Sequence, residues 1–173
     1  MTSGYEEAKA QRNVLEKLGS LIPGFRGFQD RELRRDVDKL QREHIAGEIG
    51  RVKAQLRDKA RAYTDGGQIA LLGPFDRLDR RLDGLGQSVR FADYGASGLF
   101  DAVKIGEAEL QRLYELDLSL LEDLAALRAE VAGIPAPGQA DASAALDRLE
   151  QHVRALDEKW NGRERVISNV VRG

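Results

Sequence analysis

The sequence predicts an all-α protein, an elongated helical bundle of about four to five helices that is coiled-coil-like in parts. Over long stretches, apolar residues recur at spacings of three and four, as they do on one face of a helix. Glycine and proline clusters separate these stretches, and no strand-like alternation persists beyond a few residues. With 173 residues, the chain is long enough for one domain with a sizeable core.

The first two helices are predicted over about 5–21 and about 30–64, joined by a loop at 23–29. Pro23 ends the first helix, because proline cannot continue the backbone hydrogen-bond ladder. Glycines 66 and 67 end the second.

The apolar face of the second helix changes direction near its middle. One face carries Leu33, Val37, Leu40 and His44, and a rotated face carries Ile45, Ile49, Val52, Leu56 and Tyr63. The change falls at Gly47 and Gly50, which would permit a kink or a close helix crossing. Alternatively the helix is straight and contacts different neighbours along its length.

A third helix is predicted over about 75–89, followed by a loop at 92–99. The segment 99–106 is ambiguous, since a helix could begin there or only near Glu107. Residues 107–131 carry two adjacent apolar stripes that cover about half of the helix circumference. This helix should therefore be central and contacted from two sides.

Asp117 lies in the middle of that apolar arc. A buried carboxylate without a partner is strongly unfavourable, so Asp117 should be hydrogen-bonded or paired with a cation. We expect a buried polar pair between His44 and Asp117.

The C-terminal region divides into a linker at 134–140 and a last helix within 141–173, leaving 1–133 as the main bundle. Spacings of four and three in the last helix define a narrow apolar seam. Its residues are Leu146, Leu149, Val153, Leu156 and Trp160. Such a seam packs on the chain's own bundle or on a partner chain.

The net charge of −2 argues against a globally basic nucleic-acid binder, but the charges are segregated along the chain. Residues 23–62 contain eleven basic and seven acidic side chains, whereas 91–133 contain three basic and nine acidic. We expect the basic and acidic helices to lie side by side. The alternative is a basic surface that meets an anionic membrane or an acidic partner.

No residue pattern indicates catalysis. The absence of cysteine excludes disulfides, thiol nucleophiles and cysteine-based metal sites. No Glu-x-x-His pair, nucleophile elbow or phosphate-binding glycine fingerprint is present. We therefore predict no cofactor, metal or small-molecule substrate, and an enzyme or metal protein using His44 and Asp117 is the least favoured alternative. With no signal peptide or apolar run of membrane-spanning length, we expect a cytoplasmic protein.

Two glycine-rich loops carry aromatic residues that could form one surface patch for a partner. The patch would consist of Phe25, Arg26, Phe28, Asp93, Tyr94 and Phe100. The alternative is that Phe25 and Phe28 fold inward and close the end of the bundle.

The same loops resemble those of a group of small bacterial helical proteins without a known function. The resemblance rests on Ile22-Pro23-Gly24-Phe25-Arg26-Gly27-Phe28 and on Tyr94-Gly95-Ala96-Ser97-Gly98-Leu99-Phe100-Asp101-Ala102-Val103. It covers roughly Leu21 to Leu124, implies a bacterial origin and transfers no catalytic residue.

The function expected from these patterns is that of a non-catalytic helical interaction or assembly protein. Its partner would be another protein or a second copy of the chain, the latter through the C-terminal seam. A peripheral binder of an anionic membrane surface is the first alternative.

Overall fold

The computed structural model describes residues 4–25, 34–92 and 106–172. This part of the chain is all-helical and contains no strand, which confirms the predicted fold class. No helix in these ranges is long and apolar enough to cross a membrane. The α-helices are α1 (Gly4–Leu21), α2 (Arg34–Asp65), α3 (Leu72–Phe91), α5 (Glu107–Ala132) and α6 (Ala142–Arg172), and a short 3-10 helix spans Ile69–Leu71.

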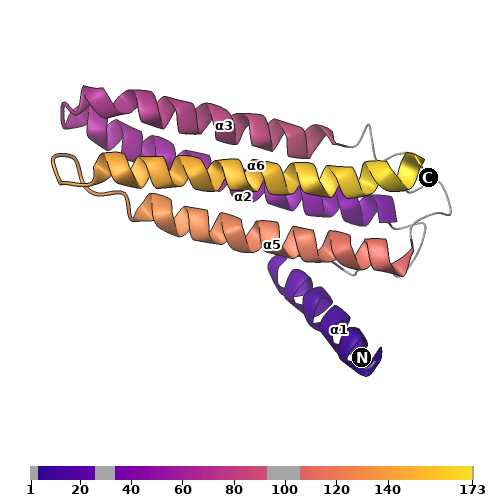
Figure 1. The fold of residues 1–173 in the computed structure, drawn as a ribbon. Coiled ribbons are helices and arrows are strands. Elements are labelled where there is room, and N and C mark those ends of the chain that lie inside the picture. The colour runs from indigo at the N-terminus through magenta and orange to yellow at the C-terminus, as the bar shows by residue number, and fades with distance from the viewer. Residues whose placement is uncertain (1–3, 26–33, 93–105, 173) are drawn as a thin grey trace.

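The four longest helices form an elongated bundle, shown in Figure 1. Helix α2 packs against α3 and α5, and α6 packs against the same two helices from the other side. The order around the bundle is therefore α2, α3, α6, α5, which makes two layers, α2–α3 and α5–α6. Helix α1 projects from the bundle and packs mainly on α5 (Figure 1). Helix α5 thus touches α1, α2 and α6, as expected for a central helix with two apolar stripes.

Most helix ends lie within a few residues of their predicted positions. Helix α6 passes through Asn161 and Gly162 without a break and fills most of the predicted range 141–173. Of the ambiguous segment, residues 99–105 lie outside the described ranges, and α5 begins at Glu107 after an extended Gly106.

The expected change of face in α2 does not come from a close helix crossing. Helix α2 is continuous through Gly47 and Gly50, and a Cβ atom built on either glycine would meet nothing within 4 Å, so no helix crosses closely there. The buried stripe of α2 continues from Ile45 toward the N-terminus, but polar residues occupy it. Leu40 and His44 lie beside this stripe and are only partly buried.

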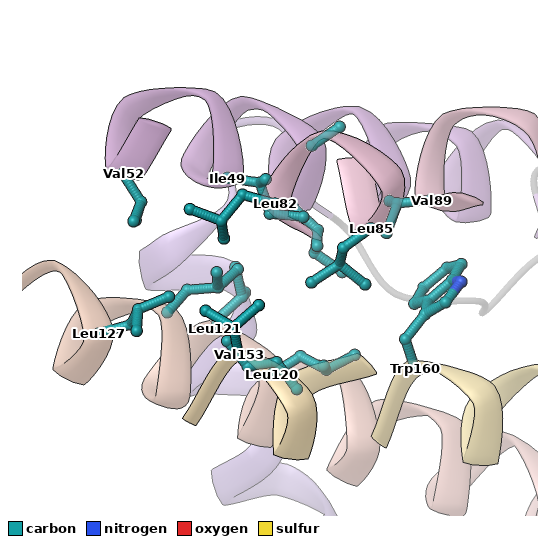
Figure 2. Packing of buried hydrophobic residues seen from close by; sticks show 14 of the residues in the cluster. Ile49, Val52, Leu82, Leu85, Val89, Leu120, Leu121, Leu127, Val153 and Trp160 are labelled. Carbon is teal, nitrogen blue, oxygen red and sulfur yellow. The ribbon is translucent and has the colours of Figure 1, made fainter. Parts of the chain in front are cut away.

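The seam of α6 faces the core of its own chain. Its five predicted residues are between 0 and 2% exposed, and α6 packs on α3 and α5. Figure 2 shows Trp160 pointing from α6 toward Leu85 and Val89 of α3. Of the two arrangements left open by the sequence, the structure shows packing on the bundle. This burial removes the seam as a surface for another chain.

The segment 134–140, the predicted linker, joins α5 to α6 and is attached to the bundle. Ile134 belongs to the core and is 3% exposed. The Tyr63 hydroxyl donates a hydrogen bond to the carbonyl oxygen of Pro135 at 2.6 Å. Lys59 Nζ donates to the carbonyl oxygens of Ala132 and Ile134 at 2.9 and 3.2 Å. The C-terminal helix is therefore part of one four-helix core.

Candidate functional site

Charged side chains are buried in the core where α2 begins and α6 approaches its end. Asp38, Arg42, Asp117 and Arg163 are between 0 and 3% exposed. We refer to these four residues as the charge layer. Gln41 of α2, which directly precedes Arg42 in the sequence, is also fully buried.

Arg163 of α6 joins the two aspartates of the charge layer. Its Nε donates to Asp117 Oδ1 at 2.6 Å, and its Nη2 donates to Asp38 Oδ1 at 2.7 Å and to Asp117 Oδ2 at 3.3 Å. The guanidinium also lies 5.0 Å from the ring centroid of Trp160, within cation–π range. One arginine thus links α6 to both α5 and α2.

Arg42 completes the charge layer from the other side. Its Nε donates to Asp38 Oδ2 at 2.8 Å, and its Nη1 donates to the carbonyl oxygen of Arg90, near the C-terminus of α3. Two arginines and two aspartates give a formally neutral layer with contacts to all four bundle helices. Buried charges are tolerated when they are paired in this way.

Burial and pairing act in opposite directions on the pKa values of this layer. Burial raises the pKa of Asp117, and this effect exceeds the opposing effect of Arg163. Burial also lowers the pKa of Arg163, but Asp117 and Asp38 more than compensate, so that pKa is raised. Glu164, beside the layer, has its pKa raised by burial.

The predicted His44–Asp117 pair is wrong. Asp117 is paired, as a buried carboxylate must be, but its partner is Arg163. His44 lies off the buried stripe of α2, and burial lowers its pKa while the nearby Glu48 opposes this effect. Among the described residues, no group of three or more potential ligands is placed to hold a metal ion.

Sequence reasoning missed Asp38, Arg42 and Arg163, although the spacing pointed to them. The seam spacing of α6 continues by three from Trp160 to Arg163 and by four to Ile167, both of which are buried. On α2, steps of three, four and seven back from Ile45 reach Arg42, Gln41 and Asp38. Charged residues at core spacing were the available signal.

Only one member of the predicted aromatic patch lies in the described ranges. Phe25 is partly buried, and its ring meets Tyr114 of α5 edge-on, with centroids 5.9 Å apart and planes at 87°. Phe25 therefore folds inward against the bundle and does not extend from the surface as a member of the predicted patch. Outside the described residues lie Arg26, Phe28, Asp93, Tyr94 and Phe100.

The outer face of the α2–α3 layer is hollowed by two neighbouring cavities, which we call together the α2–α3 groove. Their volumes are about 220 and 380 Å³. The charged lining residues are Lys39, Arg42, Glu43, Lys53, Arg57, Asp83 and Arg90. Five of these seven are basic, and Arg90 borders both cavities.

Ion pairs neutralise one end of the groove. Lys53 pairs with Asp83, and Arg57 makes a two-pronged pair with Asp79 at 2.8 and 3.0 Å. Lys53 is also the main reason why the pKa of Asp83 is lowered. The guanidinium of Arg90 makes no ion pair within the described ranges. At the same end as Arg90, Lys39 lies 3.8 Å from Glu43 and Arg42 is paired with Asp38, so Arg90 itself carries the positive excess of the groove.

Apart from the charge layer, inter-helix ion pairs run within each layer and between α3 and α6. In the α5–α6 layer, Lys159 pairs with Asp123, and His152 Nδ1 lies 2.9 Å from Glu130. Glu150 of α6 lies near two arginines of α3. The basic helix α2 does lie beside the acidic helix α5 as predicted, but no ion pair in the described part of the chain joins them.

The two layers carry opposite net charges. Helices α2 and α3 together contain thirteen basic and nine acidic residues, a net of +4. Helices α5 and α6 contain eight basic and twelve acidic residues, a net of −4. The near-zero total charge thus conceals a charge separation across the bundle.

The sequence matches no family model, and neither a curated protein nor a solved structure is significantly similar to it. Its function must therefore be argued from the surfaces and buried groups of this chain.

Proposed function

We propose that the protein is a non-catalytic helical interaction protein that self-associates through its oppositely charged layers. The observation that carries the proposal is the separation of +4 on α2–α3 from −4 on α5–α6. Two copies that present opposite layers to each other attract, whereas copies that present like layers repel. The charge distribution favours one relative orientation.

The strength of this association follows from the kind of groups involved. The long apolar seam of α6 lies in the core of each chain, and Phe91 is the large apolar side chain that the described part of the two layers leaves exposed, so the contact between chains rests mainly on polar and charged side chains. Exposed ion pairs contribute about 0–1 kcal/mol each and are screened by salt. We therefore expect a weak association that depends strongly on ionic strength.

Binding to an anionic membrane is the competing explanation for the basic α2–α3 layer. An interfacial membrane protein needs apolar side chains that enter the lipid as well as cations. Phe25, the described member of the predicted aromatic patch, packs on Tyr114 of α5 and is not free to enter a lipid surface. This contact favours a protein partner over a lipid surface.

Sedimentation velocity of the purified chain tests the proposal. At about 0.02 M salt the average mass should rise with concentration above that of the monomer, and at about 0.5 M salt it should return to the monomer. A monomer at every concentration in low salt contradicts self-association. Co-sedimentation with vesicles of anionic phospholipid by a chain that stays monomeric would support the membrane alternative instead.

A further inference from the structure

We infer that copies associate head to tail, with the outer face of α5 of one copy occupying the α2–α3 groove of the next. This inference rests on the proposed self-association and specifies its surfaces. It is argued from the shape and charge of the groove, from the small residues along it, and from the face of α5 that would enter it.

The cations of the α2–α3 groove are distributed along a line. Lys39 and Arg57 are eighteen residues apart on α2, which corresponds to about 27 Å along the helix axis. A compact anion cannot reach both ends, so the groove suits an extended occupant. Glu43 and Asp83 interrupt the line and would repel a continuous phosphate backbone. A protein helix, which carries charges of both signs, can satisfy such a lining.

Two glycines leave gaps between the side chains on the α2 side of the groove. Gly47 and Gly50 are exposed in the interior of α2, and a Cβ atom on either would meet nothing within 4 Å. Internal packing therefore does not require glycine there, although glycine destabilises a helix interior relative to alanine. The missing side chains allow the backbone of another helix to approach α2.

The outer face of α5 has the complementary properties. Glu115, Glu122, Ala126 and Ala129 share one exposed face of this helix. With seven acidic and two basic residues, α5 is the most acidic helix of the bundle, and Glu122 has no ion pair in the described part of the chain. Its alanines are small enough for close approach to the glycines of α2.

The position of these two surfaces sets the symmetry of the assembly. The groove lies on one layer of the bundle and α5 lies in the other. A contact between different surfaces leaves a bound pair with a free groove on one copy and a free α5 face on the other. Such contacts generate rings or open chains rather than twofold dimers.

Complementation between two charge-reversed chains tests the head-to-tail contact. Arg90→Glu damages only the groove, and Glu122→Lys damages only the α5 face. Each variant alone should be monomeric in low salt. In an equimolar mixture association should return, because every contact between unlike chains again brings opposite charges together at these two positions. Arg80→Glu is the matched control. Arg80 is exposed on α3 outside the groove, so this variant should associate like the native chain.

Alanine substitutions separate binding from folding. The double variant Gly47→Ala/Gly50→Ala should unfold at equal or higher urea concentration than the native chain but associate at least about tenfold more weakly. Gly84→Ala, exposed on α3 outside the groove, should gain stability without losing association.

The outcomes of these experiments distinguish the head-to-tail contact from the proposed self-association on which it rests. A native chain that is monomeric in low salt overturns both. A native chain that self-associates while Arg90→Glu and the double alanine variant associate equally well overturns the inference alone. Monomeric variants that fail to combine when mixed also overturn the head-to-tail contact. Circular dichroism of each variant confirms that it is folded.

Discussion

Arg163 occupies a position in α6 where the spacing of the seam would place an apolar residue. It is instead 1% exposed and hydrogen-bonded to two aspartates from two other helices. A buried ion pair contributes little net stability compared with well-packed apolar residues, because desolvation offsets most of the attraction. Removing one partner is costly, however, since it leaves a buried charge uncompensated. The layer therefore restricts which helix ends can pack together more than it strengthens the fold.

Arg163→Met should lower the free energy of unfolding by about 3–5 kcal/mol, because it leaves Asp117 without a cation. Urea unfolding followed by circular dichroism measures this loss. Arg165→Met, at an exposed neighbouring position, is the control and should change stability by less than about 0.5 kcal/mol. If both substitutions have equal effects, the charge layer does not determine the cost.

The raised pKa of Asp117 predicts a pH-dependent contribution to stability. A carboxyl group whose pKa is higher in the folded state than in the unfolded state binds protons preferentially in the folded state. Its contribution is fully present below the unfolded pKa and is lost as pH rises through the folded pKa.

The unfolding free energy of the native chain, relative to that of Asp117→Asn, should therefore fall as the pH is raised from about 4 toward neutrality. Urea unfolding of both chains over this range measures the difference, which cancels the effects of titrating groups that do not interact with Asp117. A difference that grows with pH would contradict the direction of the pKa shift.

At the scale of the element, α6 shows why its apolar seam was compatible with packing on the chain's own bundle or on a partner chain. A narrow apolar stripe on a helix specifies that something covers it, but it does not specify whether the covering helices belong to the same chain. Here α3 and α5 cover it. Helix α5 shows the converse, because its two stripes required neighbours on two sides, and α1 supplies the additional one.

Leu156 is fully buried, so Leu156→Ala should cost about 2–5 kcal/mol of unfolding free energy. Chemical unfolding measures the loss, and Ala155→Ser on the exposed side of the same helix turn is the control, expected to change stability by less than about 0.5 kcal/mol. A variant with native stability and altered oligomeric mass would instead place Leu156 at an interface between chains.

At the scale of the whole molecule, the segment 134–140 joins α5 to α6 without separating them. Its contacts with Tyr63 and Lys59 attach it to the end of α2, and Ile134 extends the core beneath it. The four bundle helices therefore share one core and should unfold together.

The single tryptophan makes this cooperativity measurable. Trp160 is buried in α6, so its fluorescence reports the C-terminal helix, while far-ultraviolet circular dichroism reports all helices. The two urea transitions should have the same midpoint and slope. A fluorescence transition at lower urea concentration would show that α6 detaches first and that the four helices do not unfold as one unit.

The sequence by itself determined the helical fold, most helix ends and the charge segregation, because these properties follow from residues close together in the chain. The apolar spacing within α3 and α5 is a local pattern, and Pro23 and Gly66 were predicted to end helices from their own backbone preferences. The need of Asp117 for a partner was also local, since it follows from one carboxylate in an apolar arc.

Only the tertiary structure decided which groups meet. Asp117 and Arg163 are 46 residues apart, and Asp38 and Arg163 are 125 apart, so no local spacing relates them. The covering of the α6 seam and the alignment of basic α2 with basic α3 likewise depend on how the helices are ordered around the bundle. Periodicity states which face of a helix is buried, whereas the identity of its neighbour is a property of the packed chain.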